Sequence, residues 1–144
     1  MQDMPEHNRL NVVDVTSKIQ IIEGRPWSGK TSRLLQKIRS KQDQNTTCPI
    51  IFLRDTTEEQ KEELNKIFAY TLGARYLIPS GMGVSDLGEY FYETTKKFCE
   101  DYRVLDKYID LYIDDSCIDY DSIPGSLAKL APMVNSITVT SNMV

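Results

Sequence analysis

The sequence has few of the residues from which metal and redox sites are commonly built. Its one histidine, His7, lies in a polar stretch at the start of the chain, so we expect no histidine-based catalytic or metal site. The three cysteines, Cys48, Cys99 and Cys117, are far apart, and none belongs to a C-x-x-C pair. This spacing predicts neither a disulfide framework nor a zinc site. We expect free thiols in a reducing compartment, each acting as a small buried hydrophobic side chain.

Long apolar runs and an excess of positive charge are also absent. No hydrophobic stretch approaches the roughly 20 residues that cross a bilayer, and residues 1–9 are polar and do not resemble a signal peptide. We therefore expect a cytoplasmic protein with no membrane association. The formal net charge is −4, which does not indicate nucleic-acid binding, although a local basic patch is compatible with it.

The sequence is long enough to form one globular domain. Of its 144 residues, 40% are hydrophobic and 26% are charged, as is ordinary for a globular protein. We expect an N-terminal tail and short strand over residues 1–17 and one domain over residues 18–144. Strands are expected at 12–15, 19–22, 49–53, 75–78, 108–113 and 136–140. Strands that alternate with helices predict an α/β fold, a three-layer sandwich around a mainly parallel sheet.

Helices are expected in four places between these strands. The first covers residues 31–41. The second begins at a capping box near Thr57 and ends at a glycine cap, Gly73, with an apolar face of Leu64, Ile67, Phe68 and Leu72. The third begins at a cap on Ser85. Its stripe is Leu87, Tyr90, Phe91, Thr94, Phe98 and Tyr102. We interpret this stripe as core, with a base-stacking surface as the alternative. A short helix is expected over 126–131.

The segment 24–31, Gly-Arg-Pro-Trp-Ser-Gly-Lys-Thr, fits the phosphate-binding pattern G-x-x-x-x-G-K-[ST] at every fixed position. It follows a predicted strand and precedes a predicted helix, so free backbone N–H groups and the helix dipole point at one spot. Lys30 can reach the β- and γ-phosphates, and the Thr31 hydroxyl can bind Mg²⁺. The nucleotide-binding residues are predicted to be Gly24, Arg25, Pro26, Trp27, Ser28, Gly29, Lys30, Thr31 and Ser32.

Two further polar segments follow predicted strands. The strand at 108–113 ends in Asp114 and Asp115. An apolar strand that ends in an acidic pair resembles the Walker B element of P-loop NTPases, which implies that Asp114 holds the metal and that Asp115 orients or deprotonates the attacking water. Asp110 alternates with apolar neighbours, which suggests an edge or partly exposed position, and it is our second choice for the metal. The segment Thr140, Ser141 and Asn142 at the end of the last predicted strand is a third candidate, with a frayed polar C-terminus as the alternative. A polar residue there, with Thr140 as our choice, can hydrogen-bond the γ-phosphate or the attacking water.

Together these motifs resemble the Walker A and Walker B elements of the P-loop NTPase superfamily. The separation of Lys30 from Asp114 leaves room for a further strand, as in the class of ATPases with an additional strand between the two Walker elements. The resemblance implies ATP or another nucleoside triphosphate with Mg²⁺, catalytic roles for Lys30, Asp115 and Thr140, and a protein partner or homo-oligomer that completes the site. Many such ATPases have a glutamate where Asp115 stands, so hydrolysis is expected to be slow.

A local likeness to thymidine kinases is confined to residues 28–35 and 113–115. That family's paired cysteines are missing, and its lasso is expected to be missing too, so a shortened relative is implied. Three functions therefore stay open at this point. They are a P-loop ATP hydrolase, a nucleoside kinase, and a non-catalytic nucleotide-binding or interaction module.

Overall fold

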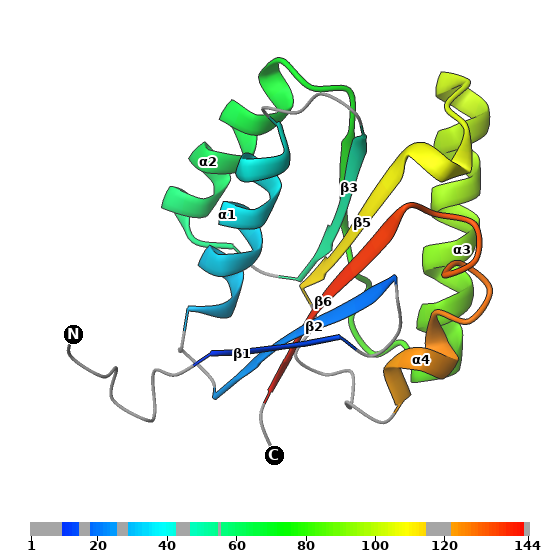
Figure 1. Cartoon of the computed structure of the whole chain (residues 1–144), viewed down its shortest axis with the longest axis horizontal. Helices are drawn as coiled ribbons and strands as arrows, with labels where there is room; N and C mark the ends of the chain where they lie inside the picture. Colours follow the sequence, from blue (N-terminus) through cyan, green and yellow to red (C-terminus); the bar gives the residue numbers. More distant parts are fainter. Residues whose placement is uncertain are drawn as a thin grey trace.

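The polypeptide forms a six-stranded sheet in the order β1-β2-β6-β5-β3-β4 (Figure 1). The computed structural model describes residues 10–14, 18–25, 29–42, 47–54, 56–114 and 122–142. The strands are β1 (Asn11–Asp14), β2 (Ile19–Gly24), β3 (Cys48–Leu53), β4 (Ala74–Leu77), β5 (Ile109–Asp114) and β6 (Ser136–Asn142). β1 pairs antiparallel with β2, and the other neighbouring strands pair parallel. The predicted α/β fold with a mainly parallel sheet is confirmed.

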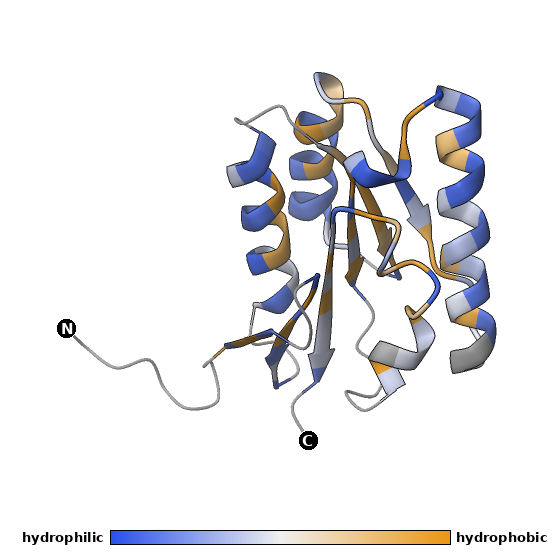
Figure 2. Cartoon of the chain, turned by 45° about the vertical axis from the view of Figure 1, so that its right-hand side comes forward, coloured by the Kyte–Doolittle hydropathy of each residue, from blue (hydrophilic) through white to orange (hydrophobic). Residues whose placement is uncertain are grey.

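Helices cover both faces of the sheet (Figure 1). α1 (Lys30–Gln42) and α2 (Glu58–Ala69) lie on one face, and α3 (Val84–Tyr102) and α4 (Ile123–Ser126) lie on the other. A 3-10 turn, η2 (Asp106–Tyr108), leads into β5. Each face has its own cluster of buried apolar side chains, and Figure 2 shows the hydrophobic residues concentrated on the strands. The predicted three layers are therefore present.

The second helix begins as predicted but ends earlier. Thr57 is its N-cap, and the Thr57 and Gln60 side chains each accept a hydrogen bond from the other's backbone N–H, so the capping box is confirmed. The helix stops at Ala69 with Tyr70 as its C-cap, so the predicted cap at Gly73 is wrong. Leu72 lies beyond the helix and is 52% exposed. Gly73 serves close packing instead, because a Cβ there would lie 2.3 Å from the Pro49 carbonyl oxygen.

The third and fourth helices also differ from expectation at their starts. The N-cap of α3 is Gly83 and not Ser85. In the predicted stripe Leu87, Phe91 and Phe98 are buried, which confirms the core interpretation for them, whereas Tyr102 is exposed. The short helix lies at α4 and not at 126–131, because a proline is tolerated in the first helical turn.

Two of the three cysteines lie in the described residues. Cys48 and Cys99 are both buried and free, as predicted. Burial raises the pKa of Cys48 to about 11 and that of Cys99 to about 12, so both stay protonated at neutral pH. Cys117 lies outside the described residues.

Candidate functional site

The C-terminal ends of β2, β6 and β5 lie side by side at the same end of the sheet. In the parallel register Gly24 of β2 stands beside Asn142 of β6, and Thr140 of β6 stands beside Asp114 of β5. The first residue of α1, Lys30, lies just after β2 in the chain. The strand order therefore gathers side chains from three distant parts of the sequence around the start of α1.

The described ends of the 24–31 segment have the backbone geometry that the motif predicts. Gly24 is the last residue of β2, and Lys30 is the first residue of α1. Gly29 has a φ of 88°, in the region where a side chain is strained and glycine is favoured. The Gly29 carbonyl accepts the α-helical hydrogen bond from the Arg33 N–H at 3.0 Å. Gly29 thus lets the chain turn directly into α1.

The ammonium group of Lys30 lies at the centre of the site. Lys30 is only 8% exposed. Its Nζ donates to the carbonyl oxygens of Gly24 at 3.0 Å and of Arg25 at 2.8 Å, and to Oδ1 of Asn142 at 2.9 Å. Burial lowers the pKa of Lys30, and the negative charge of Asp114 opposes this shift. A buried cation is thus held at the junction of β2, β6 and α1.

Asp114 joins the start of α1 to β6. Thr31 Oγ1 donates a hydrogen bond to Asp114 Oδ2 at 2.7 Å, and Thr140 Oγ1 donates to Asp114 Oδ1 at 2.6 Å. Each carboxylate oxygen therefore has its own hydroxyl partner. Asp114 and Thr31 are half-buried, and Thr140 is buried. These contacts hold the carboxylate beside the first turn of α1.

The described members of the predicted site fall into two groups. Gly24, Lys30, Thr31, Asp114 and Thr140 are brought together by these contacts, and Gly29 lies next to Lys30 at the turn into α1. The side chains of Arg25 and Ser32 are exposed, and of Arg25 it is the backbone carbonyl that contacts Lys30. The remaining predicted residues lie outside the described residues, and these are Pro26, Trp27, Ser28 and Asp115.

Asn142 belongs to the candidate polar segment 140–142, in which Thr140 is the residue chosen for the predicted site. Nothing in that segment predicts a contact of Asn142 with a lysine 112 positions away. The contact follows from the pairing of β2 with β6, which places Asn142 beside Gly24.

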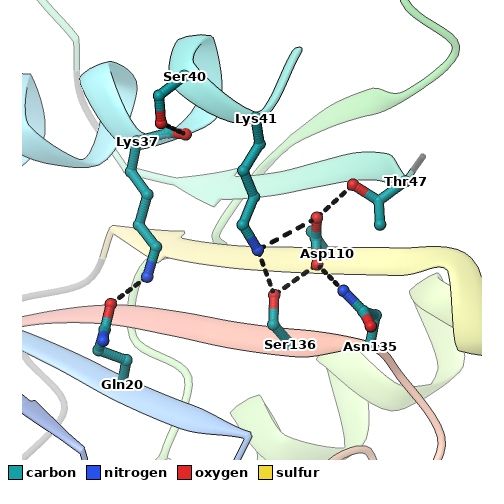
Figure 3. A network of polar contacts seen from close by, with 8 residues as sticks. All are labelled: Gln20, Lys37, Ser40, Lys41, Thr47, Asp110, Asn135 and Ser136. Carbon is teal, nitrogen blue, oxygen red and sulfur yellow. Dashed lines mark hydrogen bonds and ion pairs between the residues drawn. The ribbon is translucent and has the colours of Figure 1, made fainter. Parts of the chain in front are cut away.

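The interpretation of Asp110 as an edge or metal carboxylate is wrong. Asp110 is 1% exposed in β5, which is a central strand. Its carboxylate accepts hydrogen bonds from Thr47 Oγ1, from Ser136 Oγ and from Asn135 Nδ2, the last at 2.8 Å (Figure 3). Lys41 Nζ lies 3.6 Å from Asp110 Oδ2. Asp110 stands four residues before Asp114, roughly 13 Å along β5. Its contacts link the N-terminal ends of β5 and β6 with the residue before β3, at the end of the sheet opposite to the candidate site.

Replacing Asp110 with asparagine is expected to lower the free energy of unfolding by about 2 kcal/mol at neutral pH, because a buried, multiply bonded carboxylate is lost. Burial alone raises the pKa of Asp110, but its three hydrogen bonds and Lys41 outweigh burial and bring the pKa below its usual value. The stabilisation is therefore present above pH of about 4 and is lost as the pH falls through the folded-state pKa.

Urea denaturation at several pH values measures this effect. The difference in stability between the two proteins should shrink below pH of about 4. The exposed Asp101, replaced by asparagine, is the matched control and should change stability by less than about 0.5 kcal/mol. An Asp110→Asn protein as stable as the original at pH 7 would contradict the prediction.

Two side chains at the site, those of Thr31 and Asp114, could contribute oxygen ligands to a metal ion. Within the described ranges no cluster of three or more His, Cys, Asp or Glu side chains could hold a metal by itself. Thr31 and Asp114 offer one hydroxyl and one carboxylate, which are hard oxygen donors. Mg²⁺ is commonly held by one or two carboxylates together with substrate phosphates and water. Two protein donors would leave most positions around such an ion to other ligands.

A groove of about 480 Å³ lies away from these residues. It is lined by Thr47, Cys48, Tyr70, Thr71, Leu72, Arg103, Val104, Leu105 and Tyr108. These residues precede or begin β3, follow α2 and α3, and precede β5. No predicted site residue lines the groove, so it is separate from the candidate site.

Within the described part of the chain, no helix combines the length and the apolar character needed to cross a bilayer. No protein-family model matches the sequence, and no curated protein matches it significantly. The motif residues and their positions in the fold are therefore the features of this chain that bear on its function.

Proposed function

We propose that this protein binds a nucleoside triphosphate, with ATP as the first choice, together with Mg²⁺, and hydrolyses it slowly. The observation that carries the proposal is the 2.7 Å hydrogen bond from Thr31 Oγ1 to Asp114 Oδ2, between residues 83 positions apart. P-loop NTPases hold the nucleotide-bound Mg²⁺ with a hydroxyl at the start of a helix and an acidic residue at the end of a strand. The two matching groups are in contact here.

The strand order gives independent support. β6 lies between β2, which leads into the 24–31 segment, and β5, which ends at Asp114. This order resembles the class of P-loop ATPases in which an additional strand separates the two Walker elements. In such parallel sheets ligands bind at the carboxyl ends of the strands. The ends of β2, β6 and β5 are where the polar contacts converge.

Each residue then has a defined role. Lys30 and the backbone N–H groups at the start of α1 would bind phosphate oxygens. Thr31 and Asp114 would hold Mg²⁺, which neutralises negative charge on the phosphates. Thr140 donates a hydrogen bond to Asp114 and so would position the carboxylate that holds the metal. This role differs from the contact with the γ-phosphate that was expected from the sequence.

Two parts of the proposal come from the sequence resemblance alone. Asp115 is proposed to position the attacking water, and its side chain is one methylene shorter than the glutamate of many related ATPases. A partner protein or a second copy of the chain is proposed to supply the arginine that stabilises the transition state. Both features make turnover by the isolated chain slow.

Calorimetric titration with ATP and Mg²⁺, followed by a phosphate-release assay, tests the proposal. We expect a dissociation constant below about 1 mM and turnover below about 1 s⁻¹. Phosphate release should not require a nucleoside acceptor. Transfer to thymidine in place of hydrolysis would replace the proposal with a nucleoside kinase, and the absence of binding at millimolar ATP and Mg²⁺ would refute both.

A further inference from the structure

We propose that Asn142 and Lys30 form a latch, an internal contact that a bound phosphate must open, and that this latch regulates nucleotide affinity. The inference rests on the proposed function, because it assigns to Lys30 the role of binding phosphate. It goes further by giving Asn142 the opposite effect from a binding residue. Asn142 is expected to weaken nucleotide binding.

The hydrogen-bond count at Lys30 is the basis of the latch. An ammonium group has three N–H donors. All three are matched within the chain, by the carbonyl oxygens of Gly24 and Arg25 and by Oδ1 of Asn142, at 2.8 to 3.0 Å. A phosphate oxygen that takes a hydrogen bond from Lys30 must therefore replace one of these acceptors.

Asn142 is the acceptor that a phosphate can displace most readily. The acceptors on Gly24 and Arg25 are backbone carbonyl oxygens, at the last residue of β2 and at the residue after it, so they cannot rotate away from Lys30 as a side chain can. Asn142 reaches Lys30 from β6 through its side chain alone. Asn142 is half-buried, so water can satisfy its amide after Lys30 leaves.

The fold fixes the latch in place. Asn142 pairs with Gly24 in the parallel register of β6 and β2. Its side chain therefore needs no backbone movement to reach Lys30. A ligand that competes with an internal contact binds with an affinity reduced by the stability of that contact. Removing the Asn142 acceptor should thus favour the phosphate-bound position of Lys30.

Titration of the whole chain with ADP and Mg²⁺ tests the latch. ADP is the probe because it lacks the γ-phosphate, so a direct contact between Asn142 and that group cannot contribute. Replacing Asn142 with alanine is expected to lower the dissociation constant for ADP about three- to tenfold. The exposed Asn65 of α2, replaced by alanine, is the matched control and should leave it unchanged.

Thermal unfolding separates a latch from a merely structural role. The Asn142→Ala protein should melt at a lower temperature than the original without ADP, and the gap should narrow at saturating ADP. A structural role would leave the gap constant. Asn142→Leu keeps a similar side-chain volume and removes the acceptor, so it should show the same changes in ADP affinity and melting temperature. It replaces Asn142→Ala in both experiments if the alanine protein folds poorly.

The outcomes also separate this inference from the function on which it rests. If the original protein binds no ADP or ATP at millimolar concentration, the proposed function fails. If the original binds ADP and Asn142→Ala binds it equally or more weakly, the latch is refuted and the proposed function stands.

Discussion

Replacing Lys30 with alanine is expected to weaken the binding of ATP with Mg²⁺ by about 100-fold or more. Lys30 supplies a cation that is 8% exposed at the start of α1. Hydrogen bonds that involve a charged group are worth about 1.5 to 3 kcal/mol each, and the ammonium can offer several to the β- and γ-phosphates. Calorimetric titration in parallel with the original protein measures the loss.

The loss must be separated from misfolding. Lys30 lies in the first turn of α1 and outside both clusters of buried apolar side chains, so its removal should leave the core and the fold intact. Circular dichroism and thermal unfolding check this. Lys66, an exposed lysine of α2, replaced by alanine, is the control and should bind ATP normally. Unchanged ATP affinity in Lys30→Ala would mean that the segment does not bind phosphate.

The second large effect is expected at Asp114. Replacing it with asparagine keeps the shape of the side chain and removes the negative charge that would attract Mg²⁺. The amide can still accept a hydrogen bond from one of the two hydroxyls, so the fold should persist. We expect phosphate release to fall on the order of 100-fold, and Mg²⁺ should no longer strengthen ATP binding.

Magnesium titrations measure both consequences. ATP affinity is determined with Mg²⁺ and with EDTA, and the ratio of the two should approach one in Asp114→Asn. This readout holds even where turnover is slow. Asp101→Asn, at an exposed position of α3, should keep the ratio of the original protein. A variant at Asp114 that still responds fully to Mg²⁺ would remove this carboxylate from the metal site.

The sequence predicted which segments form helices and strands better than it predicted the residues at which they end. Runs such as 49–53 are apolar over their whole length, as strands buried on both faces are, and β3 is fully buried. The end of α2 was misplaced because Leu72 continues the helical spacing of Leu64 and Phe68. That spacing carries no information on where the backbone leaves the helix. Gly73 was misjudged because its close approach to Pro49 depends on packing.

The part of the site that lies within one local motif could be predicted from the sequence. The contacts between residues of different strands could not. Lys30 and Thr31 are recognisable because their spacing to Gly24 and Gly29 is local. The burial of Asp110 depends on Thr47, Asn135, Ser136 and Lys41. These partners lie far from Asp110 in the chain, and an alternating pattern cannot reveal them. The contact of Asn142 with Lys30 likewise needs the strand order.

The position of β6 has a consequence for how quickly the site can respond. Its backbone is hydrogen-bonded on both edges, to β2 and to β5. A shift by one residue would turn Thr140 and Asn142 to the opposite face of the sheet, so sliding of this strand is strongly opposed. On the β6 side of Lys30, the change that opens the latch is therefore a rotation of the Asn142 side chain, and rotations of exposed side chains take picoseconds to nanoseconds. The latch works on a rigid frame, and its opening does not wait for slower movements of the sheet.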